Sequence, residues 1–149
     1  MQIRRIWGGL LCLLLLRLSS SADNPGAASR QDLIWGKDLF NGTVQLRGRM
    51  STHLSDLPTE AIRCSNCHAT ATGPAVPRSD APRIGRQLLL LPQARRGGPP
   101  SRYDVASFCV LLRKGVDPAY VMVDEEMPRY TMSDAECSAL WSFLTADTP

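Results

Sequence analysis

The sequence predicts a small all-α domain with long loops. Three segments, at 31–41, 102–114 and 134–145, carry apolar residues at helical spacing between recognisable start and stop residues. No segment has the alternation of apolar and polar residues that favours a half-buried strand. The 149 residues include 11 prolines and 11 glycines, so much of the remaining chain is expected to be turn and loop.

The N-terminus predicts a secretory signal peptide over residues 1–22. Arg4 and Arg5 form a positive start, residues 6–16 are an apolar run, and the small residues up to Ala22 suit cleavage after it. An uncleaved membrane anchor is the alternative, but a span needs about 17–25 apolar residues and this run is shorter. We therefore expect an exported, soluble domain over residues 23–149.

The charge of this domain gives no indication of nucleic-acid binding. Of 17 basic residues, three arginines leave with the signal peptide, and the remaining 14 balance 14 acidic residues. The charges are unevenly spread, because arginines concentrate in residues 78–102 and acids in residues 104–147. This uneven distribution could orient a binding partner, or it could be a solvent-exposed surface with no binding role.

Residues 64–68 read Cys-Ser-Asn-Cys-His, the C-x-x-C-H pattern of covalent c-type haem attachment. The thiols of Cys64 and Cys67 can add to the two vinyl groups of a haem, and His68 can supply one axial nitrogen. A dithiol redox site would need a thioredoxin-like context, and a structural zinc site would need a second ligand pair. The sequence has neither context, so it predicts one covalent haem c, with residues 64–68 on a short helical turn.

The first predicted helix, 31–41, ends at the turn residue Gly42. The second, 102–114, follows a possible capping box formed by Ser101 and Asp104. Both have an apolar face that could pack into a core.

The third predicted helix, 134–145, follows a capping box formed by Ser133 and Glu136. The segments 42–60 and 69–100 contain no helical or strand pattern and are predicted to be loops.

A second axial ligand is expected to come from a methionine. His53 is the only histidine besides His68, and it lies in a polar segment where solvent exposure is expected. Met127 precedes Pro128, which stiffens the chain where a side chain must be held inward, so Met127 is favoured. Met122 in the same loop is the next alternative. Two further methionines lie outside the signal peptide: Met50, and Met132, which is expected to pack in the core.

Several motifs occur in the order typical of class I c-type cytochromes: Trp-Gly-Lys-Asp-Leu-Phe at 35–40, the haem motif at 64–68, and Met-Pro-Arg-Tyr at 127–130. The chain after the signal peptide resembles this family over most of its length, and bacterial periplasmic monohaem cytochromes in particular. The resemblance implies a small helical fold around one haem in a cleft, and a periplasmic location. The segment 42–63 is longer than is usual in the family.

The resemblance also implies two internal contacts. The small residue Gly36 and the aromatic Phe40 would cross the last helix against Leu140 and Phe143. A proline carbonyl would accept the second ring proton of the axial histidine, which fixes its tautomer. The candidates for that carbonyl are Pro82 and, second, Pro77.

Cys109 and Cys137 lie on helices that this fold would bring near the haem. In an oxidising compartment they could form a disulfide, and two buried free thiols are the alternative. The sequence leaves both open.

Together these observations predict a soluble electron carrier with no enzymatic activity of its own. His68 and Met127 would hold its haem iron six-coordinate. Its partners would be transient redox proteins, with an exported dehydrogenase as donor and an oxidase or larger cytochrome as acceptor. If Met127 does not ligate, the alternative is a five-coordinate haem protein that binds a small gas or performs peroxide chemistry. A dithiol protein without haem is a third hypothesis.

Overall fold

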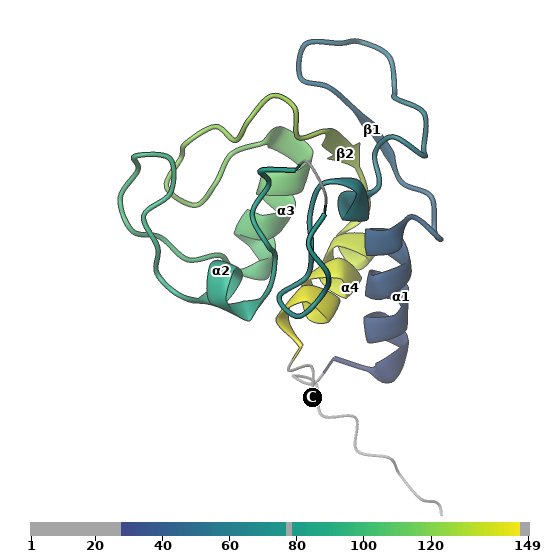
Figure 1. Ribbon diagram of the computed structural model, residues 1–149, viewed down its shortest axis with the longest axis horizontal. Helices are drawn as coiled ribbons and strands as arrows, with labels where there is room; N and C mark the ends of the chain where they lie inside the picture. Colours follow the sequence, from purple (N-terminus) through teal and green to yellow (C-terminus); the bar gives the residue numbers. More distant parts are fainter. Residues whose placement is uncertain (1–27, 77–78, 147–149) are drawn as a thin grey trace, which may run out of the picture.

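Two helices from opposite ends of the described chain, α1 (Arg30–Asn41) and α4 (Asp134–Thr145), pack across each other (Figure 1). This computed structural model describes residues 28–76 and 79–146, so the predicted signal peptide lies outside the described residues. A Cβ atom added at Gly36 of α1 would lie 2.1 Å from the carbonyl oxygen of Ala139. The two backbones therefore approach closely because residue 36 has no side chain.

The crossing has the aromatic contact that the resemblance implied, with one change of partner. The rings of Phe40 and Phe143 lie 5.8 Å apart between centroids. Gly36 meets Ala139 and Phe143, whereas the side chain of Leu140 is buried in the core.

A third helix, α3 (Val105–Lys114), packs against α4 and is covalently joined to it. Cys109 and Cys137 form a disulfide with a Cα–Cα distance of 5.8 Å, which resolves the alternative that the sequence left open. The rings of Phe108 and Trp141 lie 5.4 Å apart in the same interface.

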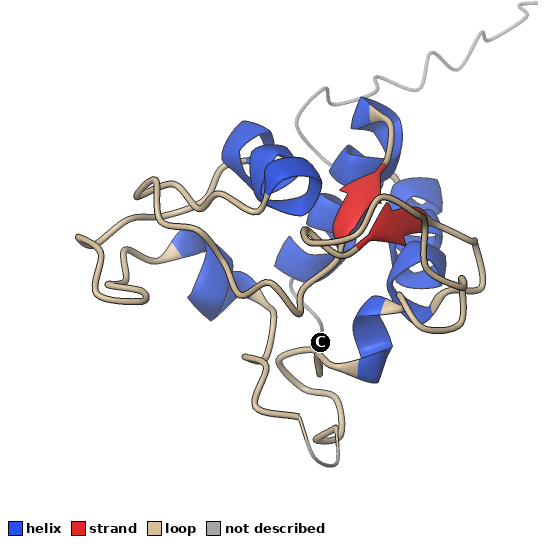
Figure 2. Cartoon of the chain, turned by 90° about the horizontal axis from the view of Figure 1, so that it is seen from above, coloured by secondary structure: helices blue, strands red, loops and turns tan. Residues whose placement is uncertain are grey.

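The predicted all-α class is wrong, because the structure also contains a small antiparallel sheet. β1 (Arg47–Arg49) pairs with β2 (Arg129–Thr131), with Gly48 opposite Tyr130, and the two strands lie together at one end of the helices (Figure 2). Each strand has only three residues, too few to produce a detectable alternation. The sheet forms through pairing between segments that are distant in sequence, which local patterns do not report.

Two shorter helical elements complete the fold: the 3₁₀ turn η1 (Cys64–Asn66) and α2 (Arg86–Leu90). The helical turn expected at the haem motif is thus present. α2 and β1 both fall in segments predicted to be loops, and there the prediction was wrong.

The helix ends follow local capping chemistry. Ser133 and Glu136 form the predicted capping box of α4, and α1 ends at Gly42, where φ is +74°. α3 begins later than predicted, because Asp104 is its N-cap and forms the capping box with Ser107. The predicted start at residue 102 was therefore wrong by about one turn.

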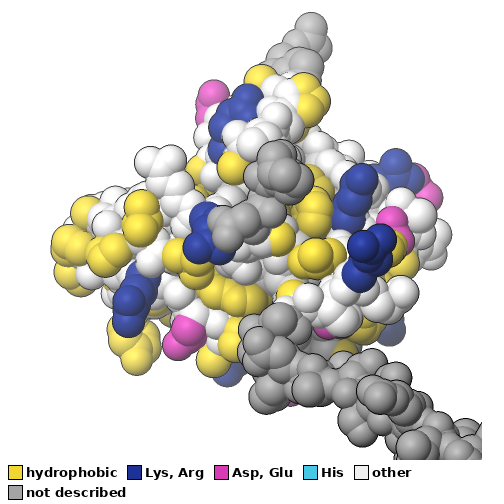
Figure 3. Space-filling model, turned by 90° about the horizontal axis from the view of Figure 1, so that it is seen from below, with side chains coloured by type: hydrophobic (Ala, Val, Ile, Leu, Met, Phe, Trp, Pro, Cys, Tyr) yellow, Lys and Arg dark blue, Asp and Glu magenta, His cyan; other side chains and the backbone are white. Residues whose placement is uncertain are grey.

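The core joins the helices, the sheet and the haem motif in one apolar cluster. Its most buried large side chains are Phe108, Leu39, Ile62, Leu89, Leu140 and Cys137. Within the described residues, no helix has the length and apolar character that a membrane crossing requires. Seen from below, basic and acidic side chains are scattered among larger areas of apolar and uncharged atoms (Figure 3).

We predict that Gly36→Ala destabilises the protein by about 1–3 kcal/mol, because the new methyl group must displace the backbone of Ala139. Helix propensity alone would predict the opposite, a gain in stability, because alanine is favoured over glycine in a helix by about 0.5–1 kcal/mol. Urea unfolding followed by circular dichroism measures the change. The exposed neighbour Lys37→Ala is the control, expected within about 0.5 kcal/mol of wild type. A stabilised Gly36→Ala would contradict the close crossing.

Candidate haem site

The haem motif forms a tight turn, and its two cysteines differ in their exposure to solvent. The amides of Cys67 and His68 both donate to the carbonyl oxygen of Cys64, at 3.2 and 2.8 Å. Cys64 is buried, Cys67 is exposed, and both thiols are free. His68 is half-buried. The turn therefore brings two thiols and one imidazole together within five residues.

This turn is fixed against the end of α1. A Cβ atom at Gly42 would lie 2.4 Å from Cγ of Arg63, so the Arg63 side chain covers the last turn of the helix. Ile62 is 2% exposed and anchors the chain in the core just before the motif. On the other side of the turn, the Asn66 side-chain amide donates to the carbonyl oxygen of Glu60 at 2.7 Å.

The ring of His68 is oriented by the main chain of Pro82. Nδ1 lies 2.8 Å from the Pro82 carbonyl oxygen, and because a carbonyl only accepts, Nδ1 carries the proton and donates it. Nε2 is then left with a lone pair. Burial lowers the pKa of His68, partly offset by the Pro82 hydrogen bond, so the ring is mainly neutral at pH 7. This is the state in which imidazole binds a metal.

Hydrogen bonds on both sides of Pro82 hold its carbonyl in place. The Ser79 hydroxyl donates to the carbonyl oxygen of Cys67 at 2.6 Å. The amide of Ile84 donates to the carbonyl oxygen of Ala69 at 2.8 Å. The segments on either side of His68 and Pro82 are thus tied together. Pro77, the other candidate for this contact, lies outside the described residues.

Tyr130 of β2 links the sheet to the haem motif. Its hydroxyl donates to the carbonyl oxygen of Ile62 at 2.9 Å and lies 4.0 Å from Sγ of Cys64. Burial raises the pKa of Cys64 to about 11, so this cysteine is a protonated thiol at neutral pH. Opposite Tyr130 in the sheet, a Cβ atom at Gly48 would lie only 3.3 Å from the tyrosine ring.

Met127 lies in a tight turn that leads into β2. Its amide donates to the carbonyl oxygen of Asp124 at 3.2 Å. The guanidinium of Arg129 donates to the carbonyl oxygens of Val123 and Asp124, at 3.3 Å each, and to that of Met127. Because Gly115 has no side chain, the guanidinium of Arg129 can lie directly against it. The Met127 side chain is half-buried and packs against the apolar core.

The other ligands considered from the sequence have different environments. His53 is exposed and contacts the hydroxyl of Thr52, and Met122 is 57% exposed. Met132 is buried in the core, as expected, and Met50 is half-buried just after β1. Burial therefore favours Met127 over Met122 as a candidate ligand, but it does not distinguish Met127 from Met50, which is equally half-buried.

Arg95, on the connection from α2 to α3, is a buried residue that the sequence reasoning missed. It is 9% exposed, and its Nε atom is buried without a hydrogen-bond partner. Nothing in a Gly/Pro-rich arginine segment indicates which arginine turns inward. A buried guanidinium nitrogen that lacks an acceptor fits the presence of an anionic group, such as a haem propionate.

An open hollow lies beside His68, lined mainly by residues 69–76 together with Phe40 and Ser65. Over residues 28–76 and 79–146, no three His, Cys, Asp or Glu side chains cluster as a metal-binding group. A haem iron does not need such a cluster, because only its axial ligands come from side chains.

None of the protein-family models, curated proteins and solved structures compared with this chain matches it. The candidate site is therefore defined by its own residues and contacts.

We predict that Tyr130→Phe lowers the free energy of unfolding by about 1–3 kcal/mol, because the buried Ile62 carbonyl loses its donor. Tyr120→Phe is the matched control, since the Tyr120 side chain is 90% exposed, and we expect a change within about 0.5 kcal/mol. Denaturant unfolding of the two variants measures the difference. Equal stabilities would mean that the hydroxyl does not hold the sheet to the haem motif.

Proposed function

We propose that this protein is an exported monohaem c-type cytochrome of class I that carries one electron at a time between other redox proteins. The observation that carries the proposal is the hydrogen bond from Nδ1 of His68 to the Pro82 carbonyl. It selects the tautomer whose Nε2 lone pair can bind iron and holds the ring in one orientation. Because His68 directly follows the C-x-x-C pair, its free nitrogen and the two free thiols belong to one five-residue segment.

Cys64 and Cys67 would form the covalent attachment. In each case the thiol adds across a vinyl group: a carbon–sulfur bond forms, the vinyl π bond is lost, and the thiol proton goes to the other vinyl carbon. No electrons are gained or lost, so the step needs reduced thiols but no further oxidant. Both thiols are free in the structure, which supports this assignment.

Met127 would supply the sixth ligand through its thioether sulfur. Its half-buried side chain, its position next to the sheet and the Arg129 contacts that fix its turn support this choice over the exposed Met122. When bound, haem c supplies a one-electron iron couple, and methionine ligation raises its potential. Two protein ligands leave no open coordination position, which suits electron transfer with little structural change.

The proposed location is the periplasm, and the support for it is the predicted signal peptide over residues 1–22. The proposed partners are an exported dehydrogenase as donor and an oxidase or larger cytochrome as acceptor, bound through small, transient interfaces. We propose no enzymatic reaction and no nucleic-acid partner.

We predict that Met127→Ala, expressed with haem-attachment machinery, keeps covalent haem but loses the weak methionine–ferric charge-transfer band. Its reduction potential should fall, because the thioether that favours the ferrous state is absent. Optical spectra and redox titration of the purified protein measure both changes. Met122→Ala is the matched control in the same loop and should keep the band and the potential.

Three outcomes would contradict the proposal. Persistence of the band in Met127→Ala would move the sixth ligand to another methionine. Wild-type protein without covalent haem would overturn the proposed function itself. Rapid and complete carbon monoxide binding to reduced wild type would instead indicate a five-coordinate protein.

A further inference from the structure

The turn that carries Met127 is tied to the rest of the fold by one side chain. Residues 124–127 bond to each other, because the Met127 amide donates to the Asp124 carbonyl oxygen at 3.2 Å and the Glu126 amide donates to the Asp124 carboxylate at 2.8 Å. Among residues 28–76 and 79–146, every hydrogen bond that reaches this turn from elsewhere in the chain is donated by Arg129. Apart from the apolar packing of Met127 itself, the position of the turn therefore depends on Arg129.

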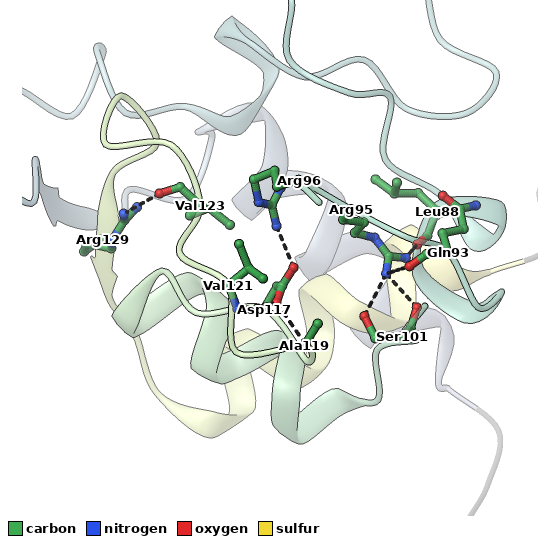
Figure 4. A network of polar contacts seen from close by, with 10 residues as sticks. All are labelled: Leu88, Gln93, Arg95, Arg96, Ser101, Asp117, Ala119, Val121, Val123 and Arg129. Carbon is green, nitrogen blue, oxygen red and sulfur yellow. Dashed lines mark hydrogen bonds and ion pairs between the residues drawn. The ribbon is translucent and has the colours of Figure 1, made fainter. Parts of the chain in front are cut away.

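The first half of the same loop is held independently of Arg129. The amide of Val123 donates to the carbonyl oxygen of Gly115 at 2.8 Å, and the amide of Asp117 donates to that of Val121 at 3.0 Å. The buried carboxylate of Asp117 accepts from the amides of Ala119 and Val121 at 2.9 Å each (Figure 4). Loss of Arg129 would therefore release the Met127 turn and leave the rest of the loop in place.

The guanidinium of Arg129 lies in a space that only glycine leaves open. A Cβ atom at Gly115 would lie 2.2 Å from both Nε and Cζ of Arg129. Nη2 donates to the carbonyl oxygens of Val123 and Asp124 at 3.3 Å each, and Figure 4 shows the side chain directed toward Val123. Nη1 donates to the carbonyl oxygen of Met127. Hydrogen bonds from a charged donor are stronger than neutral ones, so this side chain can hold the turn closed.

The sheet provides a direct contrast, because Arg49 lies opposite Arg129 in the pairing of β1 with β2. Like charges that face each other across a ladder are unfavourable, and the guanidinium of Arg129 lies against Gly115 instead. Arg49 is exposed, and within the described ranges its side chain forms no hydrogen bond or ion pair. Two arginines thus occupy facing positions, and only one of them contacts the Met127 turn.

We infer that Arg129 is a positioning residue that keeps the Met127 thioether on the haem iron. This inference rests on the proposed function and adds a residue to it. Without the guanidinium, the turn would swing away from the core more often and the iron would be open to small ligands. Three consecutive exposed acids on this turn, Asp124, Glu125 and Glu126, add to the effect, because the charge of Arg129 attracts them.

The test measures how often Met127 leaves the iron. Imidazole added to the ferric holoprotein replaces the thioether, and at high imidazole the rate no longer depends on its concentration and equals the rate at which the iron–sulfur bond opens. Loss of the weak charge-transfer band follows the reaction. In Arg129→Gln, we expect the wild-type band before imidazole is added and opening about 10–100-fold faster, which corresponds to one or two lost hydrogen bonds from a charged donor.

Two matched controls separate this role from loss of charge and from loss of stability. Arg49→Gln removes the same charge from the facing position in the sheet. Arg113→Gln removes another arginine that bonds to main chain, since Arg113 donates to the carbonyl oxygen of Met132 at 3.1 Å and pairs with Asp134 at 2.6 Å. We expect Arg113→Gln to lower the free energy of unfolding, and both controls to open within about twofold of the wild-type rate.

Three further variants test the geometry. Gly115→Ala keeps the charge of Arg129 but displaces its guanidinium, so it should also open faster than wild type. Gly97→Ala has a similar backbone strain, with φ at +77°, but open space around the new methyl group, and should stay within about twofold. Arg129→Lys keeps the charge without the planar donor group, and its rate should fall between those of wild type and Arg129→Gln.

The results distinguish failure of this inference from failure of the function on which it rests. A folded Arg129→Gln that opens at the wild-type rate, or an Arg113→Gln that opens equally fast, would overturn the role of Arg129 and leave ligation by Met127 intact. If Arg129→Gln does not fold, wild-type rates in Gly115→Ala and Arg129→Lys would overturn it. Wild-type protein without covalent haem or without the band would overturn the proposed function first.

Discussion

The close contact of α1 with α4 at Gly36 is the constraint on which the rest of the structure depends. α1 ends at Gly42 under the side chain of Arg63, so the crossing fixes where the haem motif begins. α4 follows β2 directly and is joined to α3 by a disulfide, so the same crossing fixes the loop that leads to Met127. Separation of the two helices would move both halves of the candidate site at once.

The small sheet gives a second, shorter connection between these halves. β2 lies two residues after Met127, and its Tyr130 contacts the main chain of Ile62, two residues before Cys64. The long segment 42–63 thus has a structural task, because it carries β1 back to pair with β2 before the chain reaches the haem motif. Three paired residues suffice for this because the core holds their neighbours in place.

Local sequence patterns predicted the features that local chemistry determines. Capping side chains and a terminal glycine located α1 and α4, and the spacing of Cys64, Cys67 and His68 located the turn that carries them. The contact between His68 and Pro82 was predicted only through a family resemblance, since 14 residues separate them. The sheet and the burial of Arg95 were missed, because both depend on segments that meet only in the folded chain. The start of α3 was misplaced because two capping boxes compete, and Ser107 is the partner that Asp104 takes.

The disulfide between α3 and α4 has a consequence for how the protein matures. Four cysteines outside the predicted signal peptide allow three pairings, and in the proposed function two of them must stay reduced while the other two are oxidised. Cys109 and Cys137 both follow the C-x-x-C pair in the chain, so their bridge encloses neither Cys64 nor Cys67. Oxidation of one pair and thioether formation at the other are therefore topologically independent, and either can come first without trapping the chain. Of the two motif thiols, Cys67 is the one that an oxidant would reach first, because it is exposed and Cys64 is buried.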